Sequence, residues 1–158
     1  MKQRTRMGWS VWFPVLIATG GVLAPAPLAA QETNKLEENL YTRLGGYDFI
    51  ARFVDTAFPR VAMEPQLARL FRGHSRDSQM RQRQLIVEAL CNVTGGPCVY
   101  IGRDLTTVHQ GLEITADDWT TFMAIISGAL RELNVEHRTR EAFVRLFEEQ
   151  LRPTVVVR

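Results

Sequence analysis

The sequence lacks the features that mark several common protein classes. Its two cysteines have neither the C-x-x-C spacing nor the histidine company of a redox or zinc site. After residue 30, no apolar stretch is long enough to cross a bilayer, and no alternation of apolar and polar residues indicates a β-strand. No basic stripe interleaved with aromatics is present either, so nucleic acid is not an expected partner.

The first thirty residues are typical of a secretory signal peptide. Lys2, Arg4 and Arg6 give a positive start, a mostly apolar run extends from Trp9 to Leu23, and a Pro/Ala segment ends at Ala30. We predict cleavage near Ala30 and therefore a periplasmic or secreted protein. The alternative is a retained helical anchor, because Leu28 is a mediocre residue at its place before the cut; membrane contact is expected only in that case.

Removal of residues 1–30 leaves 128 of the 158 residues, which is enough for one domain and too few for two. Three of the 19 basic residues leave with the leader, so 16 face 17 acidic residues and the formal charge is −1. The basicity of the whole chain therefore says little about its partners.

Cys91 and Cys98 are separated by a turn of Gly95, Gly96 and Pro97. In an oxidising compartment we expect a disulfide, which would tie a helix end to the following loop and stabilise it by roughly 2 kcal/mol. The alternative is a pair of free thiols.

The part after residue 31 has the apolar spacing of a chain of helices. Helical faces run over 36–44, 49–61, 79–93, 105–112, 119–133 and 143–151, the third being polar at its beginning and apolar beyond, and 64–77 is expected to be a turn of helix followed by a loop. Pro59 should kink or end the second stripe, and Pro153 should stop the last. Thr115 to Asp118 resembles a capping box. The predicted fold class is therefore all-α.

His109 lies on one stripe with Leu105, Val108 and Leu112, so its imidazole should point inward. A buried neutral imidazole must satisfy two ring nitrogens, and it does so when one binds a metal and the other hydrogen-bonds a carbonyl. Taken alone, such a histidine is more often a hydrogen-bonded core residue.

Four short motifs surround this histidine in a fixed order. They are Leu44-Gly45-Gly46, Thr94-Gly95-Gly96-Pro97, Tyr100-Ile101-Gly102-Arg103-Asp104 and Val108-His109-Gln110-Gly111-Leu112. Together they resemble the truncated hemoglobins of group I over about residues 38–156. The resemblance implies a two-over-two helical sandwich around heme b, with His109 as the ligand of the iron.

A heme site also needs an apolar slot that keeps water off ferrous iron. The residues we expect to bind the cofactor are Phe58, Phe71, Gln82, Leu85, Ile86, Tyr100, Leu105, His109 and Phe122, with Phe53 and Ile126 around the same slot. Ordinary core packing is the alternative for each aromatic. Arg81, Arg83 and Arg103 are the cations that could meet the heme propionates.

The chain departs from the family where a tyrosine usually donates a hydrogen bond to dioxygen. Phe58 aligns with that tyrosine and has no polar atom to offer. A gap-free count back from Gly95 and Gly96 makes Gln82 the replacement donor, whereas a count forward from Phe71 favours Gln79. Loss of one such bond, about 1 to 3 kcal/mol, should speed release of dioxygen.

Three functions follow from these expectations. The first is binding of O₂, NO or CO, for oxygen transport or for nitric oxide detoxification by an enzyme with an external reductase as partner. The second is electron transfer or peroxidase chemistry, which the apolar Leu85 and Ile86 disfavour. The third, in which His109 is a core residue, is a heme-free helical domain that binds a partner.

Overall fold

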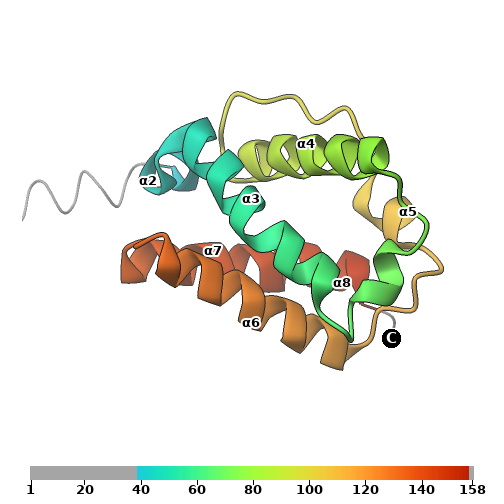
Figure 1. Ribbon diagram of the computed structural model, residues 1–158. Coiled ribbons are helices and arrows are strands. Elements are labelled where there is room, and N and C mark those ends of the chain that lie inside the picture. Colours follow the sequence, from blue (N-terminus) through green and yellow to red (C-terminus); the bar gives the residue numbers. More distant parts are fainter. Residues whose placement is uncertain (1–38, 157–158) are drawn as a thin grey trace, which may run out of the picture.

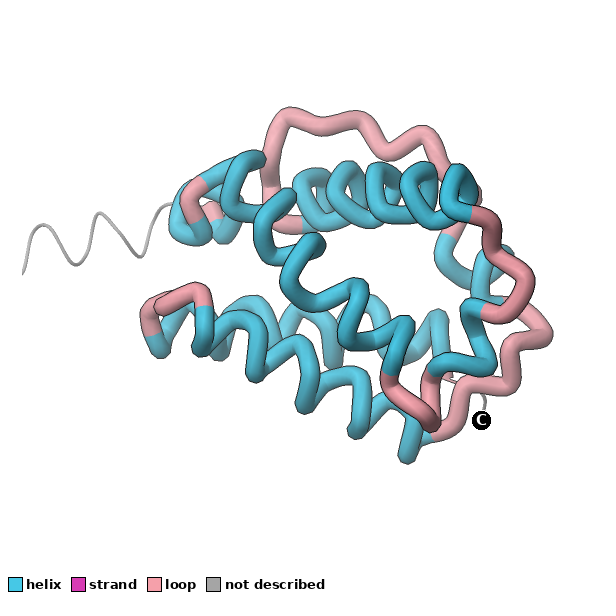
Figure 2. Tube along the Cα trace, in the orientation of Figure 1, coloured by secondary structure: helices cyan, strands magenta, loops and turns pink. Residues whose placement is uncertain are grey.

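The computed structural model describes residues 39–156, so the predicted leader and its cleavage point lie outside the described part of the chain. All regular structure within these residues is helical, as predicted (Figure 2). None of the helices between residues 39 and 156 combines the length and the apolar character needed to cross a membrane.

The described helices follow the predicted stripes closely. They are α2 (Leu40–Leu44), α3 (Gly46–Met63), α4 (Arg76–Val93), α5 (Leu105–His109), α6 (Ala116–Glu132), α7 (His137–Leu146) and α8 (Arg152–Val155), with a 3-10 turn η1 (Ala68–Phe71) and a π-helical turn η2 (Phe147–Leu151). The segment 64–77 is a turn and a loop, as expected.

The helices form two crossing pairs. Helix α3 packs against α4 and against α6, and α6 packs against α7. Figure 1 shows α4 above, α6 and α7 below, and α3 running between them. The short α5 contacts α8 and closes one end of the space between the pairs.

The core grows from the apolar face of α3. Phe49, Ile50, Phe53 and Val54 are buried there, and the Phe53 ring meets the edge of Phe143 from α7 with centroids 5.2 Å apart. Edge-to-face pairs of this kind add to the burial term. The predicted stripe thus joins the two helix pairs, while leaving space nearer α5.

Local hydrogen bonds fix where the helices begin. The Ser75 hydroxyl accepts from the amide of Ser78 at the start of α4, and the Asp104 carboxylate accepts from the amide of Thr107 at the start of α5. Thr115 and Asp118 form the predicted capping box of α6. These caps satisfy amides that have no partner within the helix.

Neither proline ends a helix. Helix α3 continues past Pro59 to Met63, because the lost amide removes only one hydrogen bond from a helix that is buried along its length. The expectation that Pro153 stops the last helix was wrong. Pro153 lies in the first turn of α8, where the amide needs no intrahelical acceptor and the fixed φ suits the helix.

The predicted disulfide between Cys91 and Cys98 is confirmed, with the two Cα atoms 5.7 Å apart. Cys91 is the completely buried member and lies in the last turn of α4. The bond joins that turn to the start of the loop that leads to α5 and His109.

Candidate functional site

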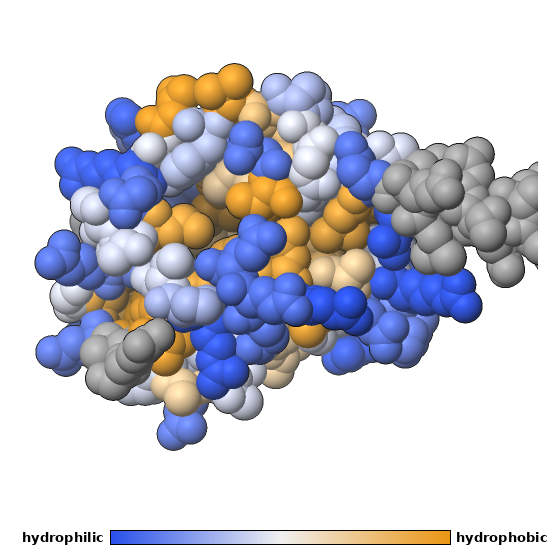
Figure 3. Space-filling view, turned by 180° about the vertical axis from the view of Figure 1, so that it is seen from behind, coloured by the Kyte–Doolittle hydropathy of each residue, from blue (hydrophilic) through white to orange (hydrophobic). Residues whose placement is uncertain are grey.

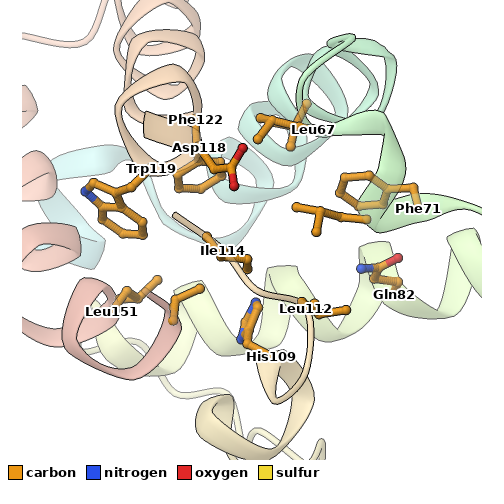
Figure 4. A pocket seen from close by; sticks show the side chains of 13 residues that line it. Leu67, Phe71, Gln82, His109, Leu112, Ile114, Asp118, Trp119, Phe122 and Leu151 are labelled. Atoms are coloured by element: carbon orange, nitrogen blue, oxygen red, sulfur yellow. The ribbon is translucent and has the colours of Figure 1, made fainter. Parts of the chain in front are cut away.

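His109 is the last residue of α5, and its ring points into the pocket drawn in Figure 4. Its Nδ1 atom lies 2.8 Å from the carbonyl oxygen of Leu105 one turn earlier. A carbonyl oxygen can only accept, so Nδ1 donates; in the neutral tautomer that does this, Nε2 carries the lone pair. This is the arrangement in which metal-binding histidines are held.

The five-residue helix that carries His109 is fixed at both ends. The Asp104 carboxylate accepts from the amide and the hydroxyl of Thr107, and these bonds lower the pKa of Asp104. After His109, the chain turns at Gly111, whose φ of 77° a residue with a side chain rarely adopts. The imidazole therefore keeps one position without relying on the length of the helix.

Two adjoining hollows open beside His109, and they share Val61, Phe71, Gln82, His109, Phe122 and Leu151. They hold about 680 and 890 Å³ of space free of protein atoms, which includes their open mouths. We call the two together the His109 cavity.

Most of the predicted binding residues line this cavity. They are Phe58, Phe71, Gln82, Ile86, Leu105, His109 and Phe122, and Phe53 and Ile126 lie there as well. The structure brings these residues together, because Phe71 lies on η1 and the others lie on faces of α3, α4, α5 and α6 that point into the same space.

The geometry favours Gln82 over Gln79 as the polar residue on α4. Gln82 lines both hollows, and its Oε1 atom is buried without a hydrogen-bond partner. Gln79 lies in an exposed stretch and lines a separate surface groove with Met80 and Arg83. A buried polar atom without a partner is uncommon in a folded protein, which marks this side chain as a candidate for a role in ligand binding.

Phe58 and Phe71 close one side of the cavity. Their rings meet edge to face with centroids 5.5 Å apart, and both also line the outer groove between α3 and α4. Neither ring offers a hydrogen bond. Among the described lining residues, the charged or hydrogen-bonding side chains are therefore Gln82, His109, Asp118 and the indole of Trp119.

Asp118 is only 3% exposed, but its carboxylate is fully satisfied. It accepts from the amide of Thr115 at 2.9 Å and from Gln66 at 3.1 Å, and it forms an ion pair with Arg69. Burial alone would raise the pKa of Asp118, but these hydrogen bonds and the cation together lower it. This carboxylate is part of the structure around the cavity.

Leu85 and Tyr100, also predicted to bind the cofactor, lie elsewhere. They line a neighbouring hollow together with Ile101, Val108 and the two arginines Arg81 and Arg103. Burial raises the pKa of Tyr100, and the nearby carboxylates of Asp104 and Glu88 add to the effect. Leu85 faces this side of α4 because it directly precedes Ile86, which faces the His109 cavity.

The third predicted arginine is engaged in an ion pair. Arg83 binds Asp55 of α3 through Nε and Nη2, each 2.8 Å from a carboxylate oxygen. Its hydrogen bond lowers the pKa of Asp55. Arg81 and Arg103 are therefore the predicted propionate cations that the described structure leaves without an acidic partner.

Sequence reasoning missed the C-terminal part of the cavity. Leu151 lines both hollows, and Val155 and Trp119 line one of them. The indole Nε1 of Trp119 donates to Glu148 at 2.8 Å, which anchors η2 against α6. The apolar spacing predicts that the stripe ending at Leu151 is buried. It does not indicate which of these apolar residues line a cavity and which lie in a filled core.

The donor set fits a heme. One neutral imidazole nitrogen is free to bind iron, and its partner nitrogen is held by a backbone carbonyl. Most of the walls are apolar, and the Gln82 side chain of α4, whose Oε1 atom is buried without a partner, lines the same cavity. Residues of these kinds in one cavity match what a histidine-ligated porphyrin and a small ligand require.

The chain matches known proteins along most of the described part. The family model for bacterial-like globins matches residues 39–155. A Group 1 truncated hemoglobin of Mycolicibacterium paratuberculosis is 29% identical over 101 residues, which is 64% of this chain and 72% of the relative.

Two solved structures share the fold. The truncated hemoglobin of Tetrahymena pyriformis in its Fe(III) form superposes with a TM-score of 0.68 at 19% identity, covering 76% of this chain and all of that one. The 2/2 hemoglobin of Synechococcus, in the cyanomet state with covalently attached heme, superposes with a TM-score of 0.68 at 21% identity, covering 77% of this chain and all of that one.

These matches define the fold as that of the truncated hemoglobins. The chain belongs to the bacterial-like globin family and is a truncated hemoglobin of group 1. It is a heme globin that binds diatomic ligands.

Proposed function

We propose that this protein holds heme b with His109 as the iron ligand and exchanges O₂ or NO in the periplasm or outside the cell. The single observation that carries the proposal is the His109 ring, whose Nδ1 is committed to the Leu105 carbonyl at 2.8 Å while the ring points into an apolar cavity. When bound, heme supplies an iron that takes a diatomic gas as a ligand.

The residues around the cavity would have separate roles toward a bound heme. Phe71, Phe122 and Leu151 line both hollows with apolar surface and would exclude water from a bound heme. Gln82 would donate to the gas ligand through its Nε2 group, because this side chain lines both hollows and its Oε1 atom has no partner among the described residues. Arg81 and Arg103, which line the neighbouring hollow, are the cations available to the propionates of a bound heme.

The distal side should hold O₂ weakly. Phe58 contributes no donor, so Gln82 alone would stabilise the partial negative charge of the ligand. Rapid exchange suits oxygen transport. Nitric oxide detoxification additionally requires electrons from an external reductase.

The proposed location rests on two features. The first 30 residues are typical of an export signal, and the disulfide between Cys91 and Cys98 is the kind of bond that persists in oxidising compartments. Fractionation of cells, with mass determination of the exported chain, tests both the compartment and the cleavage near Ala30.

One spectrum tests the cofactor. We expect the purified ferrous protein to give with CO the Soret band of a histidine-ligated heme b, and acid acetone to extract the heme. A protein without a Soret band after heme addition would instead be a heme-free helical domain.

The substitution Phe58→Tyr tests the distal argument. A restored hydroxyl should slow O₂ dissociation by about tenfold, since one good hydrogen bond contributes about 1 to 1.5 kcal/mol. Stopped-flow displacement of O₂ by CO gives the rate. An unchanged rate would mean that position 58 does not face the ligand.

A further inference from the structure

The segment that carries His109 lies near the surface along its whole length. No residue in the range 95–113 is buried. Val99 and Ile101, two aliphatic residues of the loop between α4 and α5, are 75% and 79% exposed, and Figure 3 shows apolar side chains at its upper edge, where this loop runs. Burial of apolar surface is the main force that holds a chain in place. Other bonds must therefore hold this segment.

The bonds within α5 fix its shape but not its place in the fold. The helix has five residues, too few for a stable isolated helix, and none of them is buried. Its cap, Asp104, belongs to the same exposed segment. Its main helix neighbour is α8, which has four residues. The place of His109 therefore depends on how the chain is attached before and after α5.

After α5, the chain is attached through an arginine. Arg69 of η1 donates from Nη1 to the carbonyl of Leu112 at 3.0 Å and from Nη2 to that of Glu113 at 3.4 Å. Arg69 also forms an ion pair with the buried carboxylate of Asp118. This end of the segment is therefore connected to the core by hydrogen bonds.

Before α5, the attachment is covalent. Cys91 is completely buried in the last turn of α4, and the disulfide joins it to the half-buried Cys98 of the loop. Asn92 donates to the carbonyl of Cys98 at 3.0 Å, so this hydrogen bond acts at the same point. Tyr100 donates to the carbonyl of Arg103 at 2.7 Å, a bond between two residues of the loop itself. The link through Cys98 therefore sets where the loop leaves α4.

We propose that the disulfide between Cys91 and Cys98 positions His109, and that its reduction by a dithiol loosens the iron ligand. The proposal rests on the proposed function, because His109 must bind heme iron for its position to matter. A thiolate of the dithiol attacks the Sγ atom of Cys98, the less buried residue of the pair, and Cys91 leaves as a thiolate. The second thiol of the dithiol then displaces Cys98. The dithiol gives up two electrons and two protons and becomes a disulfide, and the two cysteines take them up as two thiols.

Reduction removes this attachment without changing a residue of the His109 cavity, since neither Cys91 nor Cys98 is among its described lining residues. The loop gains conformational freedom, and α5 is then held chiefly through α8 and through Arg69 at the far end of the segment. A metal ligand needs surroundings that hold it at bonding distance. Heme should therefore be lost faster from the reduced protein.

The main test compares the oxidised, heme-loaded protein with the same protein after treatment with dithiothreitol and removal of the reagent under inert gas. We expect ferric heme to pass to excess apomyoglobin about tenfold faster from the reduced form, the lower end of the effect of removing a group that supports a metal ligand. The iron–histidine band in the resonance Raman spectrum of the ferrous form should also broaden. Reoxidation should restore the rate and the band.

Two variants separate positioning from other effects. Cys91→Ala/Cys98→Ala should behave like the reduced wild type, and dithiothreitol should change it no further. Leu130→Ala is the matched control for stability, because Leu130 is completely buried in α6 and lies outside both the segment and the cavity lining. Urea denaturation should show a loss of stability in both variants. The Raman band and the rate of heme loss in Leu130→Ala should stay as in the wild type.

The outcomes distinguish this proposal from the proposed function. Equal heme loss and equal Raman bands in the oxidised and the reduced protein would overturn the positioning proposal, while the CO spectrum still supports the heme. Changes of the same size in Leu130→Ala would also overturn it, because the effect would then follow overall stability. Absence of a Soret band in every form would overturn the positioning proposal together with the proposed function.

Discussion

Gln82 and Asp118 line the same cavity but differ in the hydrogen-bond partners of their side chains. The Asp118 carboxylate receives hydrogen bonds from Thr115 and Gln66 and an ion pair from Arg69. The Gln82 Oε1 atom is buried with no partner in the described chain. Figure 4 shows the two side chains on opposite sides of the pocket.

The difference separates structure from function within one cavity wall. A buried polar group that has all its partners stabilises the fold, whereas one without partners costs free energy until a ligand arrives. His109 belongs with Gln82, because one of its nitrogens is bonded and the other is aimed at the cavity. Four experiments can break or sharpen this comparison.

The largest effect is expected for His109→Gly. Loss of a group that only hydrogen-bonds a metal ligand already weakens metal binding about 10- to 100-fold, so loss of the ligand itself should weaken heme binding at least as much. The resonance Raman signal of the iron–histidine bond should vanish, and added imidazole should restore it. His74→Gly is the control, since His74 is exposed in the loop before α4. Stoichiometric heme with an unchanged spectrum would refute the assignment of His109.

Asp118→Asn should instead destabilise the fold and leave gas binding nearly unchanged. An amide would place its NH₂ group against donors, so we expect a loss of about 2 to 4 kcal/mol in the free energy of unfolding. Urea denaturation measures it. Asp117→Asn, an exposed neighbour in the same turn, should cost about 0.5 kcal/mol. Equal costs for the two variants would show that Asp118 is not a structural anchor.

Acid should remove the contribution that the Asp118 carboxylate makes to the free energy of unfolding. Because the pKa of Asp118 is lowered in the folded state, its stabilisation is complete above the unfolded value of about 3.9 and is lost as the pH falls through the folded value. The difference in unfolding free energy between wild type and Asp118→Asn should therefore shrink below about pH 4. A constant difference down to acid unfolding would contradict the ion pair.

The smallest effects are expected for Gln82→Leu. This substitution should stabilise the heme-free protein but weaken its hold on O₂ once heme is bound. The heme-free protein should gain about 1 kcal/mol because an unsatisfied buried amide disappears, while O₂ should leave the loaded protein about tenfold faster. Thermal unfolding and stopped-flow kinetics give the two values. Gln79→Leu should change neither, and an effect at Gln79 alone would reverse the choice between the glutamines.

The sequence was most informative where a pattern repeats along a helix. The stripe from Phe49 to Val61 predicted the buried face of α3, and Thr115 and Asp118 predicted the start of α6. It was misleading at Pro153, since the cost of a proline depends on whether its amide would have been used, and that depends on where the new helix begins.

The candidate site could be predicted only in part for a similar reason. Phe58 and Phe122 point inward by periodicity, and Phe71 was chosen from the family resemblance; all three line the His109 cavity. Leu85 and Tyr100 were grouped with them, but both line the neighbouring hollow. Leu85 is one position before Ile86 and so faces a different side of α4, and Tyr100 lies in the loop between α4 and α5. Leu151 was overlooked, because an apolar residue beside a cavity has the same sequence signature as one in a filled core.

The sequence by itself determined the helices, their apolar faces, the inward direction of His109 and the pairing of the two cysteines. These depend on spacing and on near neighbours in the chain. Only the tertiary structure decided that Gln82 is left without a partner while Asp118 is fully bonded, and that Val99 and Ile101 remain outside. Whether a polar atom finds a hydrogen-bond partner, and whether a side chain is exposed to solvent, depends on which distant segments pack against it. A local sequence pattern does not contain that information.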